Sequence, residues 1–215
     1  MINNMRARIL FTMLASLALL FVLLPAAQAG PVSITFLGPT TGSFGGVGLD
    51  PYQFSVGGVD MWLNCDDWPD HIASGDTWTA DVIAGSGALA GTRMSIYNGW
   101  SEAQADAAYS AKAWLELNSS AAANPAYSYA LWAIMCPGCG VPSPTGAAAL
   151  VTLAEAAAAA DPTLRDSLTI YSPIAARPDG SFPQELNSVP DGGVTLMLLG
   201  GALVGLETLR RRFRV

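Results

Sequence analysis

Charged residues are scarce in this sequence, and basic residues are nearly absent from its middle. Lys, Arg, Asp and Glu make up 13% of the 215 residues, about half of the usual share. Six of the ten basic residues lie within the first eight or the last six positions, so residues 30–189 hold four basic residues against fifteen acidic ones. A body with a formal charge of −11 repels phosphate backbones, which excludes nucleic acids as partners.

The sequence also lacks the common catalytic motifs. It contains one histidine, no G-x-S-x-G segment, and no Walker or G-x-G-x-x-G spacing in the glycine-rich stretch 85–91. The acidic residues do not follow the D-x-D-x-D-G spacing of a calcium loop. We therefore predict a protein that is not an enzyme and that holds no cofactor and no metal.

Only three cysteines are present. Cys136 and Cys139 form a C-x-x-C pair that follows a predicted helix instead of opening one, so a structural disulfide is favoured over a redox centre. Cys65 is then free and buried, or it pairs with one of the other two. The alternative hypothesis is a cell-envelope enzyme that uses the Cys136/Cys139 pair, or a metal site built from Cys65, His71 and the acids between them, Asp66, Asp67 and Asp70.

The hydrophobic residues concentrate at the two ends of the chain. At the start, Arg6 and Arg8 precede an apolar run over residues 9–24, and Ala27-Gln28-Ala29 follows as a small-x-small cleavage signal. This pattern predicts a signal peptide over residues 1–29, exported through the Sec translocon and cut by signal peptidase after Ala29. An uncleaved membrane anchor is the alternative reading.

Near the end, residues 194–209 form a second apolar run, followed by the arginine-rich tail 210–215. Its 16 residues would span about 24 Å as a helix, slightly less than the ~30 Å core of a bilayer. We predict a transmembrane helix here. Because basic flanks stay on the cytoplasmic side, the body between the two runs is expected to lie outside the cytoplasm.

The segment Val189-Pro190-Asp191-Gly192-Gly193, the apolar run and the arginine tail together resemble the PEP-CTERM family of sorting signals, in its VPDSG-CTERM variant. The resemblance implies a substrate of exosortase in a Gram-negative bacterium that makes exopolysaccharide. It also implies cleavage at or near residues 189–193, an intermediate anchored in the inner membrane, and delivery of the body to the cell surface or extracellular matrix. An ordinary C-terminal anchor whose turn caps the helix is the alternative.

The body is predicted to be α+β, with a small β-hairpin or barrel-like half followed by packed helices. Alternating residues on either side of Gly57-Gly58 indicate a hairpin over 52–63, with further strands at 34–38, 76–84 and 167–174. Helices are predicted over 101–117, 125–135 and 146–162. We place the domain at residues 30–171 and a proline-rich extended linker at 172–188.

The body resembles, more weakly, surface thioester domains, in which a cysteine after a strand meets a glutamine in a helix. Cys65 and the stretch 129–134 match parts of that pattern, but Ser128 occupies the glutamine position, so the thioester cannot form there. We expect a structural or adhesive role in polysaccharide, with Trp62, Trp68, Trp78 and Trp100 as candidates for stacking on sugar rings. Burial of these side chains in the core is the alternative.

Overall fold

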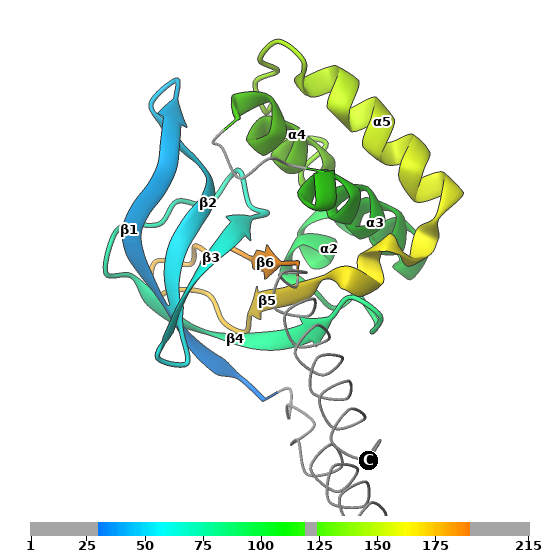
Figure 1. Ribbon diagram of the computed structural model, residues 1–215. Helices are drawn as coiled ribbons and strands as arrows, with labels where there is room; N and C mark the ends of the chain where they lie inside the picture. The colour runs from blue at the N-terminus through cyan, green and yellow to red at the C-terminus, as the bar shows by residue number, and fades with distance from the viewer. Residues whose placement is uncertain (1–29, 119–123, 190–215) are drawn as a thin grey trace, which may run out of the picture. The chain divides into compact units, whose positions relative to one another are not determined.

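The computed structural model describes residues 30–118 and 124–189, which fold as strands followed by helices and two closing strands (Figure 1). In chain order the elements are β1 (Val32–Phe44), β2 (Val47–Val56), β3 (Val59–Cys65), β4 (Thr77–Ala84), α2 (Arg93–Asn98), α3 (Glu102–Asn118), α4 (Pro125–Met135), α5 (Ala147–Ala160), the 3-10 helix η1 (Pro162–Ser167), β5 (Thr169–Pro173) and β6 (Leu186–Ser188). The predicted α+β class, with a barrel-like half before packed helices, is confirmed.

The strands close into an antiparallel barrel in the order β1-β2-β3-β6-β5-β4. The predicted hairpin is present, since Val56 pairs with Val59 across Gly57 and Gly58. Both glycines have positive φ values, 58° and 87°, as a two-residue type I′ hairpin turn requires. Inward-facing side chains of the strands, Phe54 among them, fill the barrel interior.

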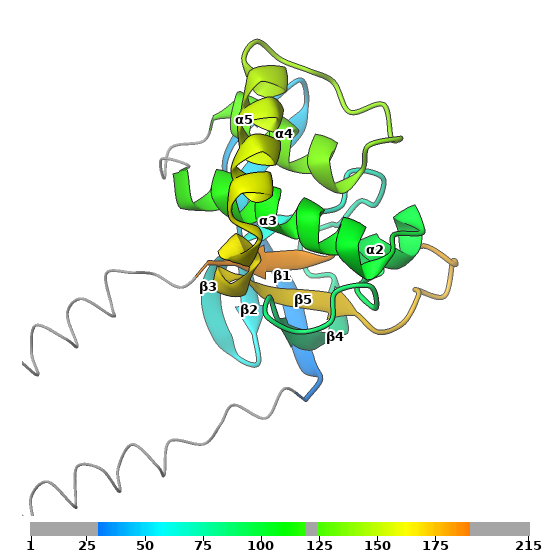
Figure 2. The same ribbon diagram turned by 90° about the vertical axis from the view of Figure 1, so that its right-hand side faces the viewer.

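The helices form a layer on one side of the barrel (Figures 1 and 2). Ser101 precedes α3, and Gln104 Oε1 accepts from the Ser101 N–H at 2.9 Å, as in a capping box. Asn124 caps α4 by accepting from the Ala126 N–H at 3.0 Å. These local signals explain why α3 and α4 begin within a residue of the predicted positions; α5 also does so, without a side-chain cap.

Three apolar clusters fill the described part of the protein, and the third joins Leu49 of β2 to Trp132 of α4. The first fills the barrel with residues that alternate along the strands: Ile34, Phe54, Leu63, Trp78 and Leu186. The second cluster packs the alanine-rich faces of the helices against each other and against β5. It includes Ala111, Leu115, Ile134, Ala154 and Ile170. Because alanines dominate the helix contacts, the helix backbones approach closely and the barrel wall lies directly beneath them.

The predicted linker over residues 172–188 is wrong. The end of this segment forms β6, which lies between β3 and β5 and closes the barrel (Figure 1). Glu185, just before β6, and Asn187, within β6, are fully buried. A strand of three residues is too short to show alternation, and the surrounding prolines lie outside it, so the sequence pattern concealed its pairing. The folded domain therefore continues to the edge of the sorting motif.

In the described part of the chain, no helix has the length and apolar content to cross a bilayer. The predicted signal peptide with Ala27 and Ala29, the predicted transmembrane helix over 194–209, the tail 210–215 and residues 190–193 of the motif lie outside the described residues.

We predict that Gly85→Ala destabilises the fold. A Cβ at Gly85 would lie 1.7 Å from the backbone carbonyl oxygen of Arg165, so the chain after β4 and the end of η1 must separate. Overpacking of this kind costs about 1–3 kcal/mol. Thermal unfolding should show a Tm lower by several degrees. Gly91→Ala is the matched control, because its Cβ meets nothing within 4 Å; equal Tm values for the two variants would contradict the prediction.

Candidate functional site

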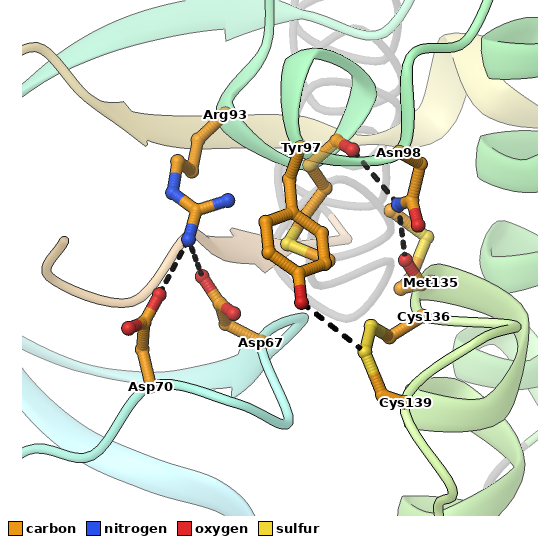
Figure 3. The surroundings of a disulfide bond; sticks show 9 residues. Asp67, Asp70, Arg93, Tyr97, Asn98, Met135, Cys136 and Cys139 are labelled. Carbon is orange, nitrogen blue, oxygen red and sulfur yellow. Dashed lines mark hydrogen bonds and ion pairs between the residues drawn. A yellow bond between two sulfur atoms is a disulfide. The ribbon is translucent and has the colours of Figure 1, made fainter. Parts of the chain in front are cut away.

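The C-x-x-C pair lies at the end of α4. Cys136 is the C-cap residue of that helix and is joined to Cys139 in a disulfide with Cα atoms 5.4 Å apart (Figure 3). Tyr97 of α2 contacts it, with its hydroxyl 3.7 Å from Cys139 Sγ. A thiol that reacts as a nucleophile is usually found at a helix N-terminus, where the dipole stabilises the thiolate; this pair has the opposite position.

The neighbouring side chains join α2 to the same end of α4. Asn98 Nδ2 donates to the carbonyl oxygens of Met94 and Met135, both at 2.8 Å (Figure 3). The hydrogen bond to Met135 and the contact of Tyr97 with Cys139 hold the short helix α2 against the end of α4. This arrangement positions Arg93, at the start of α2, over the end of β3.

Cys65 lies at the end of β3 and is enclosed. Asp50 Oδ1 accepts from its N–H at 2.6 Å, and Trp132 Nε1 donates to its carbonyl oxygen at 3.0 Å. Burial raises the pKa of the Cys65 thiol, which opposes thiolate chemistry. The strand and helix of the thioester resemblance thus do meet here. At the glutamine position, however, the Ser128 hydroxyl accepts from the Asp50 N–H at 3.1 Å.

The candidate metal ligands are dispersed by the fold. Asp66 and Asp67 are buried, Asp70 Oδ2 accepts from Arg93 at 2.5 Å, and the side chain of His71 is exposed. Among residues 30–118 and 124–189, no group of three or more His, Cys, Asp or Glu side chains is placed to hold a metal ion.

Arg93 is the centre of an open pocket of about 630 Å³. Its guanidinium lies 4.9 Å from the ring centroid of Tyr97 and 4.8 Å from that of Phe182. The same group forms ion pairs with Asp70 at 2.5 Å and Asp67 at 3.8 Å, as Figure 3 shows. The close pair with Asp70 therefore neutralises the charge of Arg93, and the pocket presents the rings of Tyr97 and Phe182 beside these polar groups.

Sequence reasoning missed this pocket. Arg93 is one of four basic residues in the body, and Tyr97 follows it at helical i+4 spacing, so a pairing of these two was within reach. Phe182 comes from the segment between β5 and β6, and no local signal connects it to α2.

Beside the pocket lies a cluster of buried polar and titratable groups that comes from α3, from β6 and from the residues next to the ends of β3 and β6. Lys112 forms ion pairs with Asp66 and with Glu116, and all three side chains have no exposed surface. Asn187 Nδ2 donates to Asp66 Oδ1, while Tyr109 donates to Glu185. We call the set Asp66, Lys112, Glu116, Glu185 and Asn187 the buried cluster. It joins the barrel to the helical layer through charged groups that water does not reach.

Burial dominates the electrostatics of the cluster. It lowers the pKa of Lys112 and raises the pKa values of Glu116 and Glu185, in each case towards the uncharged form. Burial also raises the pKa of Asp50 to about 7 and that of Asp67 to about 8, although Arg93 opposes the shift at Asp67.

The candidate stacking tryptophans differ in exposure. Trp62 is 48% exposed, whereas Trp78 is buried in the barrel, which corrects its assignment as a stacking residue. Trp68 is half-buried and packs against Tyr129 and Trp132, with ring centroids 5.6 and 5.2 Å away. Trp100 is half-buried against the helical cluster.

Comparison with known proteins identifies the C-terminal segment. A family model described as the VPDSG-CTERM motif matches residues 188–213, consistent with a PEP-CTERM-type sorting signal, and this confirms the resemblance seen in residues 189–193. No curated protein and no solved structure matches the chain.

The raised pKa of Asp67 predicts that stability falls as pH rises. The folded state keeps this carboxyl protonated up to about pH 8, whereas an unfolded chain releases the proton near pH 4. Between those values the folded state binds more protons, so the free energy of unfolding decreases with pH. Asp67→Asn mimics the protonated acid and removes this part of the decrease.

Tm measured at pH 5 and pH 8.5 tests this. The Tm of the Asp67→Asn variant should fall less from pH 5 to pH 8.5 than the Tm of the unmodified protein does. Asp60→Asn, on the exposed face of β3, is the control and should leave the pH dependence unchanged. A parallel decline in all three proteins would show that Asp67 is not the titrating group.

Proposed function

We propose that the protein is exported, processed by an exosortase-type enzyme through residues 188–213, and retained at the cell surface or in an exopolysaccharide matrix as a structural or adhesive component. The VPDSG-CTERM match carries the proposal. The signal-peptide pattern of residues 1–29 and the Cys136–Cys139 disulfide support it, because disulfides persist in oxidising compartments outside the cytoplasm.

A role without catalysis fits the chemistry of the body. The thiol of Cys65 is enclosed with a raised pKa, and the other two cysteines are joined at a helix C-terminus. His71 has an exposed side chain, and its carbonyl oxygen accepts from Arg177 at 2.9 Å. These placements favour a binding or structural protein over the redox or metal-dependent enzyme.

The Arg93 pocket is the proposed binding site for polysaccharide. Tyr97 is 50% exposed, and rings of this kind stack on the apolar faces of sugars while adjacent carboxylates and guanidinium groups bind hydroxyls. Because the close ion pair with Asp70 neutralises Arg93 and the body carries a formal charge of −11, the site favours neutral sugars over uronic acids.

Sorting is tested by the mass of the mature protein from cells that have the sorting enzyme. We expect a C-terminus within residues 189–193, whereas an ordinary anchored protein retains the arginine tail. Replacing Pro190 and Asp191 by alanine should prevent cleavage and keep the tail.

The chain offers a matched control for that change. Pro178-Asp179-Gly180 repeats the Pro-Asp-Gly order within the domain, where the Asp179 carboxylate accepts from the Ser181 N–H at 3.0 Å. Alanine at positions 178 and 179 should leave cleavage at the C-terminus intact. If both double variants are cleaved normally, the motif at 189–193 is not the recognition sequence.

Polysaccharide binding is tested with Tyr97→Ala. We expect affinity for a neutral glucan to fall roughly tenfold, equivalent to about 1.4 kcal/mol, because the stacking ring is lost. Phe44→Ala removes an exposed ring at the end of β1 that does not line the pocket and should bind as the unmodified protein does. Affinity electrophoresis through gels that contain a neutral glucan or a uronic-acid polymer measures both. Unchanged mobility of Tyr97→Ala would exclude the pocket.

A further inference from the structure

Lys112 is the only lysine in the sequence, and its side chain has no exposed surface. Lysine is seldom fully buried, because its ammonium group loses the favourable hydration that it has at the surface. Here it lies in the middle of α3 and reaches towards the end of β3. A chain that otherwise lacks lysine thus places its single primary side-chain amine in the interior, against acidic groups.

Two carboxylates form ion pairs with Lys112. Nζ contacts Asp66 Oδ1 directly, and it lies 3.5 Å from Glu116 Oε1 one helical turn further along α3. An ammonium group carries three N–H donors, whereas the nitrogen of a secondary amide carries one. If Nζ were an amide nitrogen, its single N–H could donate to Glu116, and its hydrogen-bonding requirement would then be met by a group already in place.

The two oxygens of Asp66 have different surroundings. Oδ1 accepts a hydrogen bond from Asn187 Nδ2 on β6. Oδ2 is buried and accepts no hydrogen bond from any residue that the structure describes. A buried carboxylate oxygen without a donor is unfavourable, because it has lost its hydration without a replacement. Loss of this oxygen would remove that cost, and the oxygen that remains already has its donor.

From this geometry we propose that Lys112 and Asp66 are joined by an intramolecular isopeptide bond between Nζ and Cγ. The lysine amine attacks the carbon of the protonated aspartic acid, and Oδ2 leaves as water. Glu116 takes one proton from the attacking nitrogen and delivers a proton to the leaving oxygen. The reaction is a condensation, so it changes no oxidation state and requires no cofactor. Oδ1 becomes the amide oxygen and keeps its hydrogen bond from Asn187.

The electrostatics of the cluster agree with this chemistry. Burial lowers the pKa of Lys112, which favours the uncharged amine that acts as the nucleophile. Burial also raises the pKa of Glu116, so that this carboxyl holds a proton more readily than an exposed one and serves as a shuttle. The product is neutral at Asp66 and Lys112, and two charges no longer have to be kept out of water.

The bond is measured on the full chain after denaturation and reduction of the disulfide. If it is present, an amine-reactive ester labels the chain α-amine but not Lys112, and the mass is lower than the sequence mass by one water. Trypsin then fails to cut after Lys112, and the peptide that ends at Arg93 stays linked to the peptide that begins at Met94. A labelled Lys112 with no loss of water would overturn the proposal.

Two variants separate this bond from other losses of water, such as succinimide formation at Asp-Gly. Lys112→Arg keeps the positive charge but lacks the reactive amine, and it should have the full sequence mass; a loss of water in this variant would overturn the proposal. Glu116→Gln keeps the shape of the side chain but cannot shuttle protons. It should show Lys112 labelled in most molecules, and complete bond formation would exclude Glu116 as the proton carrier.

Discussion

The burial of charge between the barrel and the helical layer is the constraint on which the rest of this structure depends. Asp66 at the end of β3, Lys112 in α3 and Asn187 in β6 come from three distant parts of the chain and must meet without water. A buried carboxyl or amine that lacks its partner is strongly destabilising, so each element is held in one register by the other two. The apolar clusters stabilise the packing of the helices and the barrel. The buried cluster determines how the two layers align.

The Arg93 pocket is a consequence of that alignment. The backbone N–H of Arg93 donates to Ser172 on β5 at 2.7 Å, and the Ser172 hydroxyl donates to Glu185 of the buried cluster at 2.7 Å. The interior and the open surface thus share one continuous set of hydrogen bonds. A ligand stacked on Tyr97 would rest on a rigid support, which reduces the entropy that binding must overcome.

Local signals in the sequence were sufficient to predict the helices and most of the strands. They were not sufficient to predict the tertiary contacts between these elements. Gly57-Gly58, Pro125 and Pro162 marked a turn, a helix start and a helix end because each acts through its own backbone. β6 escaped detection because three residues carry no periodicity and one of its two partner strands, β3, lies more than a hundred positions away. A single lysine in an alanine-rich helix normally indicates a solvated face, so its burial against Asp66 depended on tertiary contacts that no local pattern encodes.

The position of β6 also bears on how a sorting signal can be removed without loss of the fold. β6 ends at Ser188, where the matched motif begins, and its partners β3 and β5 complete the barrel. Val189 packs against the helical cluster, and the residues expected at the cleavage site follow directly. A cut after that position leaves every strand and the whole buried cluster in the released body. The barrel is closed by residues that precede this position, so cleavage there would leave its stability independent of the segment removed.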